Sequence, residues 1–175
     1  PTLRFVSLQD GKTPLFMWLM PPLLKIFSDP LFAGRFLSVL AGFSTLIGVF
    51  LLALKIFNIR IALVSALIYS VVPYTVFFDR MALVDSLLAS FTIWSIFFGV
   101  WLIRSQRLDL AMILGYLLGG ALLTKTPAMM NLLALPFTIV AFNFKNYSKY
   151  SLLKLFIFWA VAILIALVMY NLLRL

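Results

Sequence analysis

Long apolar runs separated by short polar segments dominate this chain. A helix needs roughly 20 apolar residues to cross a hydrocarbon core about 30 Å thick. Runs that reach or approach this length predict six membrane spans, at residues 31–54, 61–78, 82–103, 108–123, 128–144 and 152–173. Asp29 and Pro30, just before the first run, form a typical helix start. The pattern therefore predicts an all-α fold, a polytopic integral membrane helix bundle of about six spans.

The residues before the first span predict a different kind of structure. Residues 1–12 are mixed in polarity and are expected to form an outer loop. Residues 13–27 are apolar but too short to cross, and Pro21 and Pro22 interrupt them, so we expect an interfacial helix that lies along the membrane surface. The chain has no initiator Met and stops as an apolar run ends. We therefore expect residues 1–175 to be part of one larger transmembrane domain.

Composition narrows the class and the chemistry. Hydrophobic residues make up 65% of the chain and charged residues 11%, which excludes a soluble globular domain. The net charge of +9 comes from cations scattered singly at span ends. This distribution indicates contact with membrane lipids, and no nucleic acid partner is expected. Cysteine and histidine are absent, which excludes disulfides, thiol chemistry and His-based catalysis.

The distribution of charge predicts which side of the membrane each loop faces. Because spans alternate, Lys and Arg divide seven against three, and the positive-inside rule makes the richer side cytoplasmic. The seven are Lys55, Arg60, Arg104, Arg107, Lys145, Lys149 and Lys154, and the three are Arg80, Lys125 and Arg174. Counting Arg4, Lys12, Lys25 and Arg35 with the outer side makes the two totals equal. Four of the five Asp residues fall on that outer side, where we expect the polar site.

Four charged residues adjoin or interrupt the apolar runs, and their presence there requires a reason. They are Asp79, Arg80, Asp85 and Lys125. A charge at bilayer depth costs about 2.5 to 3.5 kcal/mol on insertion scales. Helix capping by Asp79 and snorkelling by Arg80 would be ordinary, and Asp85 could pair with a nearby cation. Asp85 nevertheless lies a turn inside an apolar run, which favours a functional role. Lys125 lies in a reversal with no room for a loop, either as an interfacial lysine or as a phosphate contact.

Four strings of residues, in order, resemble one enzyme family. Residues 10–18 read acidic-x-Lys-x-Pro-Leu-aromatic-x-Trp, and about twenty residues on, residues 33–42 read Ala-Gly-Arg-Phe-Leu-Ser-Val-Leu-Ala-Gly. Arg80-x-x-Leu-x-Asp85 and Leu-Thr-Lys125 come next. The chain looks like the GT-C class of membrane glycosyltransferases that use polyprenyl-phosphate sugars. In particular it resembles relatives of protein mannosyltransferases and of the bacterial lipid A aminoarabinose transferase.

The resemblance implies sugar transfer from a polyprenyl-phosphate donor to an acceptor hydroxyl of a lipid, glycan or protein outside the cytoplasm. It implies that Lys12 and Lys125 bind the phosphate, that Arg80 and Asp85 are catalytic, and that Asp10 or Asp85 orients sugar or holds a divalent metal. The catalytic base would precede residue 1, so this piece alone is expected to be inactive. A role in cell-envelope glycosylation, at the outer face of a prokaryotic plasma membrane, would follow.

Two positions depart from the family pattern. Thr13 stands where relatives commonly have Pro, and Thr126 stands where they commonly have Gly, so loop geometry differs while both lysine charges are kept. The alternative class is a transporter or flippase whose charges mark an ion or lipid pathway. Such a protein would place its charges near mid-span, whereas Asp85 and Lys125 fall near span ends. Because alternating spans put them on the same side of the membrane, we expect five residues to converge at one rim of the bundle: Asp10, Lys12, Arg80, Asp85 and Lys125.

Overall fold

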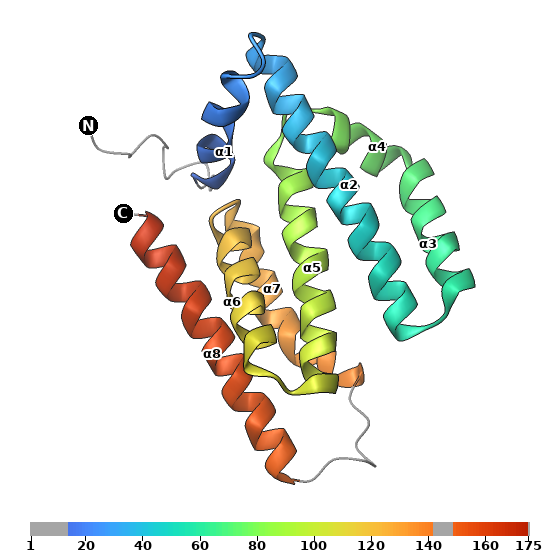
Figure 1. Ribbon diagram of the computed structural model, residues 1–175, viewed down its shortest axis with the longest axis vertical. Helices are drawn as coiled ribbons and strands as arrows, with labels where there is room; N and C mark the ends of the chain where they lie inside the picture. The colour runs from blue at the N-terminus through green and yellow to red at the C-terminus, as the bar shows by residue number, and fades with distance from the viewer. Residues whose placement is uncertain (1–13, 142–148, 175) are drawn as a thin grey trace.

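The computed structural model describes residues 14–141 and 149–174, which fold into helices with no β-strand among them. The elements are α1 Leu15–Leu24, α2 Pro30–Ile56, α3 Ile59–Val71, α4 Pro73–Arg80, α5 Val84–Ser105, α6 Leu108–Leu122, η2 Thr126–Ala128, α7 Met129–Ala134, η3 Leu135–Ala141 and α8 Lys149–Arg174. Their arrangement is an elongated bundle in which most helices run along the long axis (Figure 1). The predicted all-α membrane bundle is confirmed.

Three helices are long and apolar enough to cross a membrane, namely α2, α5 and most of α8. They correspond to the predicted spans 31–54, 82–103 and 152–173. Asp29 caps α2 as the sequence indicated, since its carboxylate accepts a hydrogen bond of 2.9 Å from the Leu31 amide and Pro30 takes the first helical position. α3 and α4 together form a fourth candidate, but the chain bends between them by 62°.

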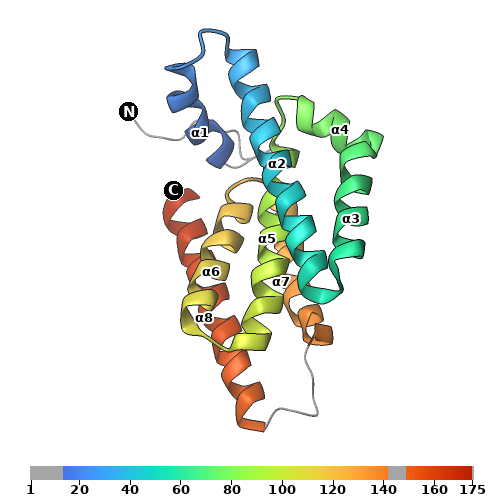
Figure 2. The same ribbon diagram turned by 45° about the vertical axis from the view of Figure 1, so that its right-hand side comes forward.

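The bend distinguishes the structure from the straight span predicted at 61–78. Pro73 opens α4, and Val72 before it is extended, with φ of −60° and ψ of 123°. A proline has no N–H to continue the helix, and its ring disfavours helical geometry in the preceding residue. The chain therefore leaves the direction of α3, and α4 turns back against α2, as Figure 2 shows.

The remaining predicted spans, 108–123 and 128–144, correspond to shorter apolar helices. α6 has 15 residues, which is about 22 Å at 1.5 Å per residue. Beyond it the chain forms η2, the six-residue α7 and η3 in place of one straight helix. Pro127 and Pro136 lie in these turns, and neither can donate a backbone hydrogen bond. The predicted length was apolar enough for a span, but two prolines divide it.

α1 is a continuous helix that includes Pro21 and Pro22 in its last turn. Phe16, only 6% exposed, packs with Leu37 of α2 and Leu87 of α5 in a small core. The Leu15 amide also donates a 2.9 Å hydrogen bond to the Leu123 carbonyl, at the end of α6. α1 is thus fixed to the end of the bundle at which α6 terminates. Its location along the membrane surface stays a prediction.

Close approach of α6 and α8 depends on glycine. A Cβ atom on Gly115 would lie 2.8 Å from Ile165 Cβ and 2.9 Å from the Ala162 carbonyl oxygen. One on Gly119 would lie 2.7 Å from Met169 Sδ. Small residues four apart let two membrane helices approach in this way. The main hydrophobic core lies along this contact and includes residues of α5, α6, η2, η3 and α8.

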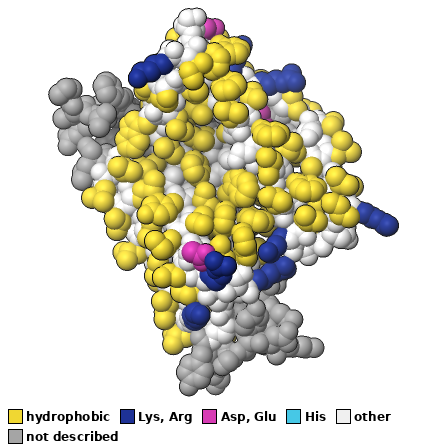
Figure 3. Space-filling view, viewed as in Figure 1, with side chains coloured by type: hydrophobic (Ala, Val, Ile, Leu, Met, Phe, Trp, Pro, Cys, Tyr) yellow, Lys and Arg dark blue, Asp and Glu magenta, His cyan; other side chains and the backbone are white. Residues whose placement is uncertain are grey.

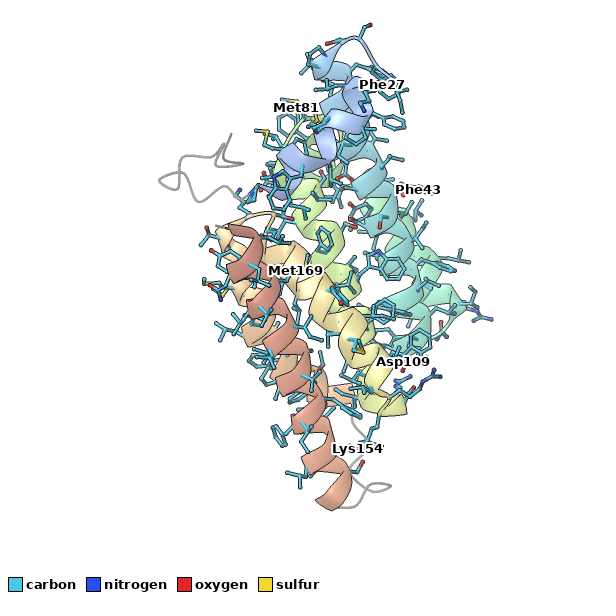
Figure 4. All side chains as sticks on the ribbon, turned by 60° about the vertical axis from the view of Figure 1, so that its left-hand side comes forward. Phe27, Phe43, Met81, Asp109, Lys154 and Met169 are labelled. Carbon is cyan, nitrogen blue, oxygen red and sulfur yellow. The ribbon has the colours of Figure 1, made fainter. Side chains whose placement is uncertain are left out.

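The two ends of the bundle carry different side chains. At one end the Arg104 guanidinium donates 2.7 Å to the Lys55 carbonyl, and Gln106 hydrogen-bonds Ser151, which joins α2, α5 and α8. Asp109 and Lys154 lie toward this end, and Phe27 and Met81 lie at the other (Figure 4). Hydrophobic side chains cover most of the face in Figure 3, with Lys, Arg and Asp in small groups.

Candidate functional site

Asp85 and Lys125 form an ion pair near the Met81 end of the bundle. Lys125 Nζ lies 2.8 Å from Asp85 Oδ1, and the two side chains are 32% and 34% exposed. Asp85 is in the first turn of α5, where the helix dipole favours a carboxylate. An ammonium has three donors, so one bond to Asp85 does not exhaust Lys125. The structure thus brings together two of the predicted site residues, 40 positions apart in the chain.

The reversal after α6 holds Lys125 in place. Thr124 is fully buried, and its hydroxyl donates 2.8 Å to the Gly120 carbonyl in the last turn of α6. Lys125 is extended, and η2 begins at the next residue with Pro127 in its first turn. The bond from the Leu15 amide to the Leu123 carbonyl adds a second restraint. The chain is therefore fixed on both sides of Lys125, and its side chain extends toward α5.

Asp79 occupies a position that the sequence did not predict. The capping interpretation is wrong, because Asp79 lies in the last turn of α4 and α5 begins at Val84. Its Oδ2 accepts a 2.9 Å hydrogen bond from the Tyr69 hydroxyl. A Cβ atom on Gly42 would lie only 2.4 Å from Asp79 Cγ, so the carboxylate lies directly against the α2 backbone. The bend at Pro73 places it there.

A cavity of about 410 Å³ lies between α2, α3, α4 and α5. Asp79 and Asp85 both line it, together with six residues that carry a hydroxyl group. These six are Thr45, Tyr69, Tyr74, Thr75, Ser86 and Thr92. Further along α5 the wall is apolar, formed by Leu88, Ala89, Ile93 and Ile96. The cavity is therefore polar near the ion pair and apolar along the span.

Arg80 lies on the other side of Asp79. It is exposed at the end of α4 and lines a smaller cavity, of about 250 Å³, formed by α2, α3 and α4. Tyr69, Thr75 and Asp79 line both cavities, whereas Arg80 borders only the smaller one and Asp85 only the larger. Arg80 thus shares a region with the ion pair without lining its cavity. Its predicted catalytic role stays a prediction.

Asp10 and Lys12 lie outside the described residues, so their predicted convergence with the ion pair is not tested. The described residues also contain no group of three or more acidic, His or Cys side chains that could hold a metal ion. Asp79 and Asp85 are engaged by Tyr69 and Lys125, respectively. Mg²⁺ is commonly bound by one or two carboxylates together with water and substrate oxygens, so these two engaged carboxylates do not by themselves define a metal site.

The helices and the charged site define a multi-pass integral membrane protein with a polar centre at span ends. The chain belongs to the dolichyl-phosphate-mannose-protein mannosyltransferase family, whose model matches residues 11–173. It is therefore a glycosyltransferase of the GT-C type that uses a polyprenyl-phosphate sugar. This membership favours the enzyme over the transporter or flippase alternative. No curated protein and no solved structure matched the chain.

Sequence reasoning missed three residues of this region: Tyr69, Asp79 as a cavity residue, and Ser86. Tyr69 lies in an apolar run with nothing around it to mark it. The available signal for Asp79 was Gly42, which leaves space in the middle of a span, and Pro73, which predicts a bend. Ser86 is adjacent to Asp85, but several other serines occur in the same helix. Only the folded structure shows that Ser86 is the one that is buried beside the cavity without a hydrogen-bond partner.

Proposed function

We propose that this protein transfers a sugar from a polyprenyl-phosphate donor to a hydroxyl of a lipid, glycan or protein acceptor on the non-cytoplasmic side of the membrane. One observation carries the proposal: the Asp85–Lys125 ion pair at the polar end of a membrane-embedded cavity, within the segment that matches the family. A donor with a lipid chain and a charged head needs such a boundary between apolar and polar surroundings.

The proposed reaction exchanges one bond at the anomeric carbon for another. The acceptor oxygen bonds to that carbon, while the bond from the carbon to the phosphate oxygen breaks and polyprenyl phosphate leaves with the electron pair. The hydroxyl proton passes to a base. Because the phosphate gains charge as the bond breaks, a nearby cation stabilises the transition state more than the bound donor. We assign this part to Lys125 and to Lys12.

The carboxylate of Asp85 has a different part. Held at 2.8 Å by Lys125, it is proposed to accept a hydrogen bond from a hydroxyl of the reacting sugar and to orient it. Arg80, exposed beside the neighbouring cavity, is proposed to position the phosphate or an acidic group. These roles need the four residues on one side of the membrane, and the contact between Asp85 and Lys125 supports that arrangement.

The outer face of a prokaryotic plasma membrane is the proposed location of the site. Lys55 and Arg104 meet at the end of the bundle away from the ion pair, where Arg107 follows α5 and Lys154 lies near the start of α8. The positive-inside rule assigns such an end to the cytoplasm.

Asp10 is proposed as a ligand of a divalent metal, and a separate experiment tests this metal role. A chelator should abolish transfer and added Mg²⁺ or Mn²⁺ should restore it, whereas unchanged transfer in the chelator would contradict the metal role.

The experiment places the intact protein in proteoliposomes with polyprenyl-phosphate mannose labelled in the sugar. We expect label to appear on an acceptor and free polyprenyl phosphate to be released, and only when donor is supplied on the side opposite the Lys55 end. Donors carrying other sugars test which one is used. Movement of intact donor across the bilayer without its cleavage would instead support a flippase and overturn the proposal.

A further inference from the structure

Ser86 is a buried hydroxyl without a hydrogen-bond partner. It is 2% exposed, lies in the first turn of α5 beside Asp85, and lines the 410 Å³ cavity. Leaving a buried polar group unsatisfied is costly, so native structures rarely do so without a reason. Ser95 in the same helix is equally buried, but its hydroxyl donates 2.7 Å to the Phe91 carbonyl. Ser86 lies in the first turn of α5, where no helical carbonyl stands four residues before it, so its hydroxyl can be satisfied only by a partner outside the helix.

The groups around Ser86 indicate the chemistry of a ligand. Asp79 and Asp85 both line the cavity, and an anionic ligand beside two carboxylates would be repelled. A neutral ligand with several hydroxyls would avoid this repulsion, since hydroxyls donate to carboxylates and both donate to and accept from serine. The apolar side chains further along α5 suit the C–H surface of a ring. These properties describe a sugar.

The carboxylate of Asp79 is well suited to accept a bond from such a ring. The Tyr69 hydroxyl holds its Oδ2 at 2.9 Å, and the absence of a side chain on Gly42 lets it lie against α2. A group fixed on two sides loses little rotamer freedom when it binds a ligand. Asp79 is therefore a preformed acceptor in the wall of the cavity.

We infer that this cavity is the binding site for the donor sugar, and that Ser86 and Asp79 determine its specificity. The inference rests on the proposed function. In the donor, the phosphate is bonded directly to the anomeric carbon of the sugar. A phosphate on Lys125 therefore leaves the sugar beside Asp85, the residue that both pairs with Lys125 and lines the cavity. Ser86 then hydrogen-bonds one sugar hydroxyl and Asp79 accepts from another.

Ser86→Ala tests this cleanly, because it removes a hydroxyl that has no partner in the protein and changes volume little. Ser95→Ala is the matched control, with the same helix and burial but a hydroxyl bonded within the helix. The intact protein is assayed with polyprenyl-phosphate mannose and with donors that lack one sugar hydroxyl each. A neutral hydrogen bond corresponds to roughly a threefold to tenfold preference in kcat/KM.

We expect the wild-type protein to disfavour one particular deoxy donor by that factor, and Ser86→Ala to treat that donor and the parent equally. Asp79→Asn should lose discrimination at a different hydroxyl, and Ser95→Ala should keep the wild-type profile. If Ser86→Ala discriminates as the wild type does, or slows all donors alike, the sugar assignment is overturned while transfer itself still stands. If it changes only the KM of the acceptor, the cavity holds the acceptor and the donor assignment fails. Absence of any transfer by the wild type would overturn the proposed function as well.

Discussion

Gly42→Ala is predicted to destabilise the protein through Asp79. The new Cβ would lie 2.4 Å from both Cγ and Oδ2 of Asp79 and 2.8 Å from Oδ1, all distances that force a shift. A shift of the carboxylate disturbs its 2.9 Å bond from Tyr69. Overpacking of this kind costs about 1 to 3 kcal/mol, and loss of a hydrogen bond to a charged group costs about 1.5 to 3 kcal/mol. The structure relaxes by whichever of these changes costs less, so we expect the free energy of unfolding to fall by about 1 to 3 kcal/mol.

The prediction is specific because a second substitution should cancel it. Asp79→Ala removes the three atoms that the new Cβ would meet, so Gly42→Ala should cost almost nothing in that background. Gly99→Ala is the matched control, since its closest contact would be Thr138 Cγ2 at 3.2 Å. It should be near neutral, because alanine also favours the helix by up to about 1 kcal/mol.

The free energy of unfolding of the four members of this cycle, measured by denaturant titration in detergent micelles, gives the coupling directly. We expect a coupling of about 1 to 3 kcal/mol between positions 42 and 79. Equal cost of Gly42→Ala with Asp79 present or absent would refute the reasoning. So would a cost no larger than that of Gly99→Ala, because the close approach of Asp79 to α2 would then have no energetic consequence.

Two further predictions concern the scaffold. Gly115→Ala should lower stability by about 1 to 3 kcal/mol, because the new Cβ would meet backbone and Cβ atoms of α8, and an unchanged melting temperature in detergent would contradict the described packing of α6 on α8. Asp29→Ala should cost about 1 kcal/mol by removing the cap of α2, and Asp29→Asn should retain most of it. Equal melting temperatures for the Asp29 variants would show that the cap contributes nothing.

Hydropathy alone predicted the parts of the fold that depend on helix length. α2, α5 and α8 are uninterrupted apolar runs, and Asp29 and Pro30 mark a helix start by local chemistry. The bend at Pro73 and the short turns after Lys125 were missed, because an average over 20 residues does not register one proline. At those points the loss of a backbone donor outweighs the apolar content of the run.

The candidate site was predictable to a similar degree. The alternation of spans predicted that Asp85 and Lys125 lie on the same side of the membrane, and this prediction needs only the number of spans between them. Their contact depends on the tight reversal that follows α6, and the place of Asp79 depends on a 62° bend. Ser86 is distinguished from Ser95 only by which carbonyl lies within reach. Such features are properties of packing, and a single sequence does not encode them in a readable pattern.

Replacement of the two proposed phosphate lysines tests the account most directly. In the intact protein, Lys12→Ala and Lys125→Ala should each lower kcat by roughly tenfold to a hundredfold, because each loses a contact to the departing phosphate. Lys25→Ala is the control, an exposed lysine just after α1. Lys125→Ala should also slow an Asp85→Asn variant further, since its effect does not depend only on the ion pair.

The central measurement is therefore kcat for sugar transfer from polyprenyl-phosphate mannose in these variants, with expression and membrane insertion verified for each. The account predicts that Lys25→Ala transfers at the wild-type rate while Lys12→Ala and Lys125→Ala are slow. It would be contradicted if Lys25→Ala slowed transfer as much as the other two, because general attraction of cations to lipid head groups would then explain all three. A wild-type rate for Lys125→Ala would contradict it equally.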